Sequence, residues 1–163
     1  MYKVNDTVIY GTQGVCKIIE IAEKDFMGKK REYYVLTPIN NASTTLFAPT
    51  DNEAVLAKLR RILSKEEIHV LVDSIGNEDP VWITNENERR EKFREILASG
   101  DHSALIQMIK ALWIQKQKRE AEGKKLHMSD ERFFKDAEQL LYDEFQYVLE
   151  INKEELISYL FKN

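Results

Sequence analysis

The chain has 163 residues, of which 43% are hydrophobic, so it can form one medium core or two small ones. Asp and Glu number 28 against 24 Lys and Arg, and the net charge of −4 argues against strong binding to nucleic acid by the chain alone. A single cysteine excludes an internal disulfide, and no run approaches the ~20 apolar residues that span a bilayer. Because the first residues lack the features of a signal peptide, we expect a cytoplasmic protein that is not inserted in a membrane.

The first part of the chain, from Val4 to about Leu63, has the two-residue period of β-strands. Over residues 15–21 this period predicts two faces, with Val15, Lys17, Ile19 and Ile21 on one and Cys16, Ile18 and Glu20 on the other. Turn signals at 11–14, 27–29 and 40–41 separate several short strands. We expect a small SH3-like or Tudor-like β-barrel over residues 1–63, because closure would cover most sheet edges.

The period becomes helical at Ser64, where Ser64-Lys-Glu-Glu67 has the form of a capping box. A first helix should end near Gly76, and the stretch Gly76-Asn-Glu-Asp-Pro80 predicts a hinge. Four further helices are predicted to begin near Asn85, Asp101, Ser129 and Asn152. The chain is therefore predicted to be α+β, with an all-α domain over residues 64–163 after the barrel.

Groups that could carry out catalysis are not arranged for it in the sequence. Cys16 lies in a predicted strand with no histidine near it in sequence, so a structural role is favoured. His69, His102 and His127 lack the spacing of a zinc site, and the glycines at 11–14 lack the Gly-Lys-Ser/Thr ending of a phosphate-binding loop. We expect no enzyme, no metal, no cofactor and no small-molecule substrate.

Two features of the helical half bear on nucleic acid. Basic side chains outnumber acidic ones between Ile109 and Lys125, which is more often a solubilising face than a track for phosphates. Trp82 follows Pro80 at the start of a helix of mixed charge, where it either packs in the core or contacts a partner. A large side chain of this kind can enter the minor groove and separate base steps. Trp113 lies in an apolar helical stripe, which favours the core.

Several motifs taken together resemble one family over nearly the whole chain. They are Lys3-Val-x-Asp-x-Val-x-Tyr-x-x-x-Gly14, Gly28-Lys-Lys-Arg-Glu-Tyr-Tyr-Val-Leu36, Leu97-Ala-Ser-Gly-Asp101 and Lys110-Ala-Leu-Trp113. The sequence resembles the CarD family, whose N-terminal domain is also similar to the polymerase-interacting domain of the transcription-repair coupling factor. The resemblance implies a bacterial regulator of transcription initiation.

In that family the β domain binds the β subunit of RNA polymerase, partly by strand pairing. The resemblance implies polymerase contacts by Lys24, at a basic contact position, and by Phe47, where some relatives carry arginine. Thr45 and Leu46 would belong to the adjoining strand, whose backbone could extend a sheet of the partner. An alternative is a non-catalytic adaptor whose barrel binds a different protein.

The family's helical domain carries a tryptophan that contacts the upstream fork of the open promoter. Trp82 is the candidate because Pro80-x-Trp82 keeps the local context, whereas an ungapped alignment places Glu86 at that position. The implied phosphate contacts are Arg89, Arg90 and Lys92. A regulator of this kind would stabilise the open promoter complex through weak, non-specific DNA contacts made while it is bound to polymerase.

Overall fold

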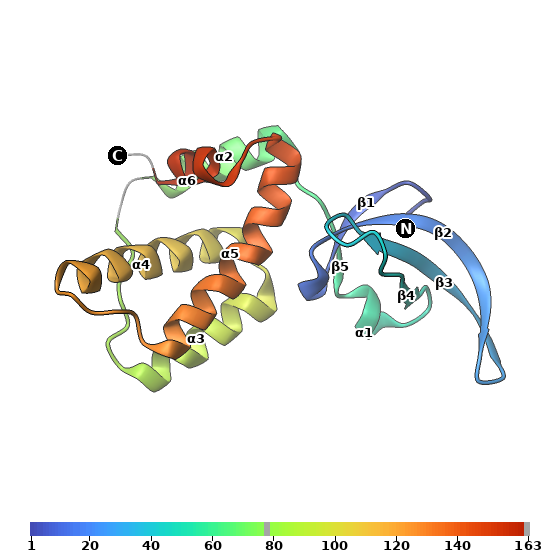
Figure 1. The fold of residues 1–163 in the computed structure, drawn as a ribbon. Coiled ribbons are helices and arrows are strands. Elements are labelled where there is room, and N and C mark those ends of the chain that lie inside the picture. Colours follow the sequence, from blue (N-terminus) through green and yellow to red (C-terminus); the bar gives the residue numbers. More distant parts are fainter. Residues whose placement is uncertain (77–78, 162–163) are drawn as a thin grey trace. The chain divides into compact units, whose positions relative to one another are not determined.

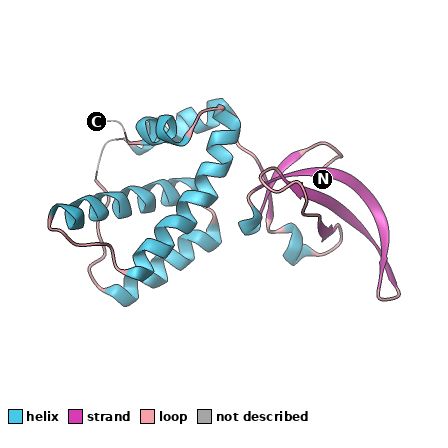
Figure 2. Ribbon diagram, viewed as in Figure 1, coloured by secondary structure: helices cyan, strands magenta, loops and turns pink. Residues whose placement is uncertain are grey.

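A computed structural model describes residues 1–76 and 79–161 of the chain. It contains two compact units, Met1–Leu63 and Ser64–Asn163 (Figure 1). The first unit is built mainly from strands, and the regular structure of the second is helical throughout its described residues (Figure 2). The chain is thus α+β, as its two periods predict.

The N-terminal unit is a five-stranded antiparallel sheet in the order β4-β3-β2-β1-β5. Its strands are β1 (Thr7–Tyr10), β2 (Val15–Phe26), β3 (Lys29–Pro38), β4 (Leu46–Pro49) and β5 (Leu59–Arg61). A 3₁₀ turn, η1 (Gly11–Gln13), connects β1 to β2. Met27 and Gly28 join β2 to β3 with φ angles of 55° and 81°, the positive values that a tight two-residue hairpin requires.

The sheet is open, so the prediction of a closed barrel is wrong in this respect. The two edge strands, β4 and β5, do not pair with each other within residues 1–63. They are joined instead through the short helix α1 (Glu53–Leu56), whose start is capped by the side chain of Asn52. Val55 and Leu56 of α1 pack against the core of the sheet, so a helical turn covers part of what strand closure would bury.

A β-bulge changes the faces of β2. Ile18 pairs with Leu36 and Glu20 pairs with Val35, which leaves Ile19 as the extra residue. Ile18 is fully buried, Ile19 is 47% exposed, and Ile21 packs against the same core cluster as Ile18. The prediction of strict alternation through residue 21 is therefore wrong, because the bulge moves Ile21 to the face of Ile18.

Residues 64–76 and 79–161 of the C-terminal unit form five helices: α2 (Lys65–Ile75), α3 (Glu86–Ser99), α4 (His102–Ala121), α5 (Met128–Leu149) and α6 (Lys153–Leu160). Its centre is α4, which buries side chains on several sides and contacts α2, α3 and α5. Its buried residues are Leu105, Ile106, Met108, Ile109, Ala111 and Leu112.

Most helix starts are those that the capping residues predict. Ser64 and Asn152 form capping boxes, and the side chains of Asn85 and Asp101 accept hydrogen bonds from the first turns of α3 and α4. The exception is α5, which begins at Met128 after His127, a residue that makes no side-chain cap. Of the predicted hinge, Asn77 and Glu78 lie outside the described residues.

Candidate functional site

The predicted polymerase contacts Lys24 and Phe47 lie on one face of the sheet. Lys24 pairs with Arg31 across the hairpin, and Phe47 pairs with Val35 on the other side of β3. Residues 31 and 35 lie on the same face because side chains alternate along a strand. This face, which we call the outer face, is opposite the one that carries the buried Tyr34 and Leu36.

Three aromatic side chains meet on the outer face. The ring centroid of Phe26 lies 5.2 Å from those of Tyr33 and Phe47, and the latter two are 6.1 Å apart. Phe26 and Phe47 are 43% and 39% exposed, whereas Tyr33 is 8% exposed beneath them. We call these residues the aromatic cluster. Sequence reasoning found only Phe47; the Met27-Gly28 turn, which sets the register, could have indicated the other two.

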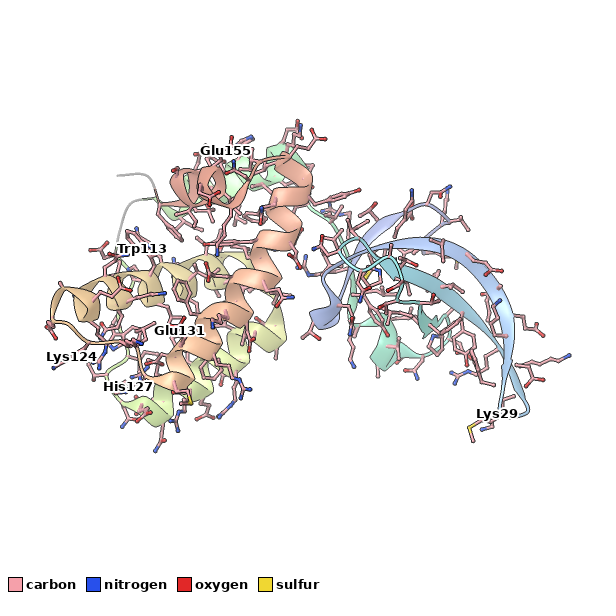
Figure 3. The ribbon with its side chains drawn as sticks, in the orientation of Figure 1. Lys29, Trp113, Lys124, His127, Glu131 and Glu155 are labelled. Atoms are coloured by element: carbon pink, nitrogen blue, oxygen red, sulfur yellow. The ribbon has the colours of Figure 1, made fainter. Side chains whose placement is uncertain are left out.

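Charged side chains of both signs accompany the aromatic cluster in this sheet. Lys24 lies 3.6 Å from Glu20, and Lys29 lies at the tip of the hairpin (Figure 3). Arg31 bonds Asp51 at 2.8 Å, and this hydrogen bond lowers the pKa of the Asp51 carboxyl and raises the pKa of the guanidinium. The outer face is thus an apolar, aromatic patch bordered by ion pairs, with Lys29 at the tip of the hairpin.

The free edge of β4 carries backbone groups available for pairing. The N–H of Thr50 donates to the carbonyl of Glu32 at 3.1 Å, so residue 50 is directed toward β3. Because hydrogen-bonded and non-hydrogen-bonded positions alternate in antiparallel pairs, the backbone groups of Phe47 face the open edge. Thr45, which the sequence predicts in this strand, lies just before β4, and the same alternation extended by two residues directs its backbone groups to that edge as well. The side chain of Leu46 packs against the core instead, so its part in any contact is through the backbone.

Trp82 lies in the segment before α3 and is half-buried. Its ring packs edge-on against Phe93, with centroids 6.4 Å apart, and the guanidinium of Arg89 lies over the ring at 4.8 Å. The stacked charge and the aromatic contact hold the indole at the surface of the helical unit without enclosing it. Trp113, by contrast, stacks on Phe161 at a centroid distance of 5.9 Å.

Arg89 is poorly placed for the phosphate contact expected of it, because its side chain is only 4% exposed. Its Nε and Nη2 donate to the two carboxylate oxygens of Asp130 at 3.0 Å, and Nη1 donates to the carbonyl of Ile83 at 3.0 Å. Asp130 belongs to α5, so one side chain connects α3, α5 and the segment that carries Trp82. This bidentate geometry is the strong form of an arginine–carboxylate pair.

Arg90 and Lys92 remain nearer the surface, and both have acidic neighbours. Nη2 of Arg90 bonds Glu86 at 2.7 Å, and Nζ of Lys92 lies 4.0 Å from Glu95. Glu86, the alternative position for the tryptophan, is therefore the partner of a candidate DNA contact. Because exposed ion pairs of this kind contribute little free energy, little is lost when the arginine or lysine binds a phosphate instead.

Residues 1–76 and 79–161 contain a single cysteine, which is buried, and three histidines in separate parts of the helical unit. No three His, Cys, Asp or Glu side chains in these ranges are grouped as a metal site would need. Burial raises the pKa of the Cys16 thiol to about 11. A neutral thiol in the sheet core is suited to packing. None of the helices in these ranges has the length and apolar character to cross a membrane.

Comparison with protein families defines the class of protein. Residues 2–63 match the CarD-like/TRCF RID domain, which is an RNA polymerase-interacting domain, and residues 70–161 match the CarD C-terminal domain. The two matches together cover most of the chain and correspond to the two units. The chain therefore belongs to the CarD family, a family of non-catalytic transcription regulators that interact with RNA polymerase.

Proposed function

We propose that this chain binds the β subunit of RNA polymerase through its sheet and stabilises the open promoter complex by placing Trp82 at the upstream fork. The observation that carries the proposal is the placement of Trp82, a half-buried indole held at the surface by the buried side chain of Arg89. A fixed and accessible tryptophan is suited to insertion between bases, because little order is lost when it binds.

The polymerase contact would combine two recognition modes. The open edge formed by Phe47 of β4 and by Thr45 just before it offers backbone groups for strand addition, and the exposed ring of Phe47 offers an apolar anchor. Lys24 adds a positive charge to the same face. A complementary surface on the β subunit would have a strand edge beside an apolar pocket with acidic residues around it.

The DNA contact would be made by fewer charges than the sequence indicates. Arg90 and Lys92 are the candidates for phosphates, while Arg89 is a positioning residue whose charge is neutralised by Asp130. Such a contact is weak and independent of DNA sequence, in agreement with the net charge of −4.

Binding to polymerase would compensate for this weakness. Once the sheet is bound, the helical unit meets promoter DNA at an effective concentration that can reach about 1 mM for a short connection. A non-specific dissociation constant of about 10⁻⁴ M would then be sufficient. The equilibrium shifts toward the open complex only because the tryptophan binds the melted fork better than the closed duplex.

The proposal is tested by adding the full chain to polymerase on a promoter and measuring the lifetime of the open complex. We expect a longer lifetime, and we expect the isolated β subunit to retain the chain in a pull-down. The variants Lys24→Glu and Phe47→Arg should reduce both effects. Capture of the chain by a protein other than polymerase, with no change in lifetime, would favour the adaptor function instead.

A further inference from the structure

A second feature of the helical unit is an open pocket of about 720 Å³ between α3 and the start of α5. The residues that line it are Arg90, Arg94, Met128, Ser129, Arg132 and Phe133. Three of these six residues are arginines, and none of the six has a carboxylate side chain. A pocket with this lining has a positive potential that attracts anions.

Two of the arginines have no competing partner. Arg94 and Arg132 are exposed and form no ion pair with another described residue. Arg90 is bonded through Nη2 to Glu86, but its Nε is buried and has no hydrogen-bond partner among the described residues. Arginines left unpaired in this way retain their planar set of donors, which matches the oxygens of a phosphate.

The start of α5 adds further unused donors to the pocket. The hydroxyl Oγ of Ser129 is buried and has no partner within the described part of the chain. His127, the residue before α5 (Figure 3), makes no side-chain cap, so the first N–H groups of this 22-residue helix lack that partner. Buried polar groups are normally satisfied, and unpaired donors beside a helix N-terminus are suited to bind an anion.

We propose that this pocket binds a phosphoryl group, held by Arg94 and Arg132 and by the hydroxyl of Ser129. The carboxylate of Asp130, the next residue along the chain, is already used by Arg89 and does not oppose the anion. Phe133 and Met128 form apolar walls, and Met128 is 88% exposed at the opening. The volume exceeds that of one phosphate, so the wall could also accept part of a sugar or base.

The phosphoryl group could come from promoter DNA or from a free phosphorylated molecule. Phe93, which is buried, contacts both Trp82 and Phe133, at centroid distances of 6.4 and 5.5 Å, so the tryptophan and one wall of the pocket pack against the same side chain. A backbone phosphate held there would direct the duplex toward Trp82. The site itself does not depend on the proposed function, because it can be tested without polymerase.

The direct test is calorimetric titration of the full chain with pyrophosphate at constant ionic strength. We expect pyrophosphate to bind the parent chain. Arg94→Gln and Arg132→Gln should each weaken this binding about tenfold, because each removes one charge-assisted contact. Ser129→Ala should weaken binding less, with no loss of folding stability, because its hydroxyl has no partner. Lys118→Gln removes an exposed charge of the same unit outside the pocket and should change nothing. Absence of binding, or equal losses in all variants, would overturn the proposal.

A second titration, with a short DNA duplex, identifies the source of the phosphoryl group. If pyrophosphate competes with the duplex and both lose affinity in Arg94→Gln, the pocket holds a DNA phosphate. If pyrophosphate binds but duplex affinity is unchanged in Arg94→Gln, the pocket holds a free phosphorylated molecule. A duplex whose affinity falls in Lys118→Gln as much as in Arg94→Gln would contradict a role of the pocket in DNA binding.

Discussion

The guanidinium of Arg89 lies 4.8 Å from the centre of the Trp82 ring while its Nε and Nη2 bond the carboxylate of Asp130. The same side chain also bonds the backbone carbonyl of Ile83, next to the tryptophan. The position of Trp82 is therefore linked to an ion pair between α3 and α5. This link explains how a segment outside any helix or strand can present a large side chain in a fixed place.

The first prediction concerns the buried pair. Asp130→Asn should lower the free energy of unfolding by about 3–5 kcal/mol, because it leaves the charge of Arg89 buried without its partner. Arg90→Gln, which removes a more exposed arginine of the same helix, should cost at most about 1 kcal/mol. Urea unfolding of both variants measures the difference. Equal, small losses would contradict the role assigned to Asp130.

A double variant separates the contribution of the Arg89–Asp130 pair to folding stability from its effect on the position of Trp82. Arg89→Met with Asp130→Leu replaces the pair by apolar side chains, which is often neutral for stability. We expect near-parent stability but greater acrylamide quenching of Trp82, measured in a Trp113→Phe background so that one indole remains. Unchanged quenching would show that Arg89 does not position Trp82.

The second prediction concerns the open edge of β4. Thr45→Pro removes an N–H that faces the edge, and proline is tolerated there, so the fold should persist while binding to the β subunit weakens. Leu46→Pro removes a group directed toward β3 and should destabilise the sheet itself. Thermal unfolding and a pull-down with the β subunit distinguish the two. Full binding by a folded Thr45→Pro variant would exclude pairing through that N–H.

The third prediction concerns the aromatic cluster. Phe26→Ala and Phe47→Ala should each weaken binding to the β subunit, and their effects should not add, because the rings touch at 5.2 Å. Aromatic pairs of this kind contribute about 0.5–1.5 kcal/mol beyond their buried area. Val4→Ala, at a residue 45% exposed, is the matched control. Strictly additive losses, or an equal loss for the control, would remove the cluster from the interface.

The fourth prediction is a pH dependence in α5. Burial raises the pKa of the Asp143 carboxyl above its ordinary value of 3.8, so the folded chain retains this proton when the unfolded chain has lost it. Stability from this group is complete below the ordinary value and is lost as pH rises through the folded pKa. Asp143→Asn should therefore stabilise the fold at pH 7, with a gain that shrinks on acidification. Unfolding curves with the same gain at every pH would contradict this assignment.

Local signals explain which parts of this fold were predicted. Ser64, Asn85, Asp101 and Asn152 satisfy backbone groups within three residues of themselves, so the starts of their helices follow from sequence alone. The bulge at Ile19 depends on pairing with β3, and no residue type within β2 indicates its position. The open sheet likewise depends on which element lies between β4 and β5.

The site was predicted less completely for the same reason. The burial of Arg89 depends on Asp130, which is 41 residues away in the chain. Adjacent arginines look alike in sequence, yet Arg89 is enclosed while Arg90 lines a pocket. The aromatic cluster also needed the strand register, which brings Phe26 and Phe47 together from two different strands.

The most direct test of the central claim is the lifetime of open promoter complexes formed with polymerase and saturating amounts of the parent chain, Trp82→Ala or Val81→Ala. Val81 is the matched control because it adjoins Trp82 and is 89% exposed. We expect the parent and Val81→Ala to extend the lifetime equally, and Trp82→Ala to shorten it about tenfold toward the value without the factor. A parent-like lifetime for Trp82→Ala, with polymerase binding intact, would contradict the role assigned to Trp82.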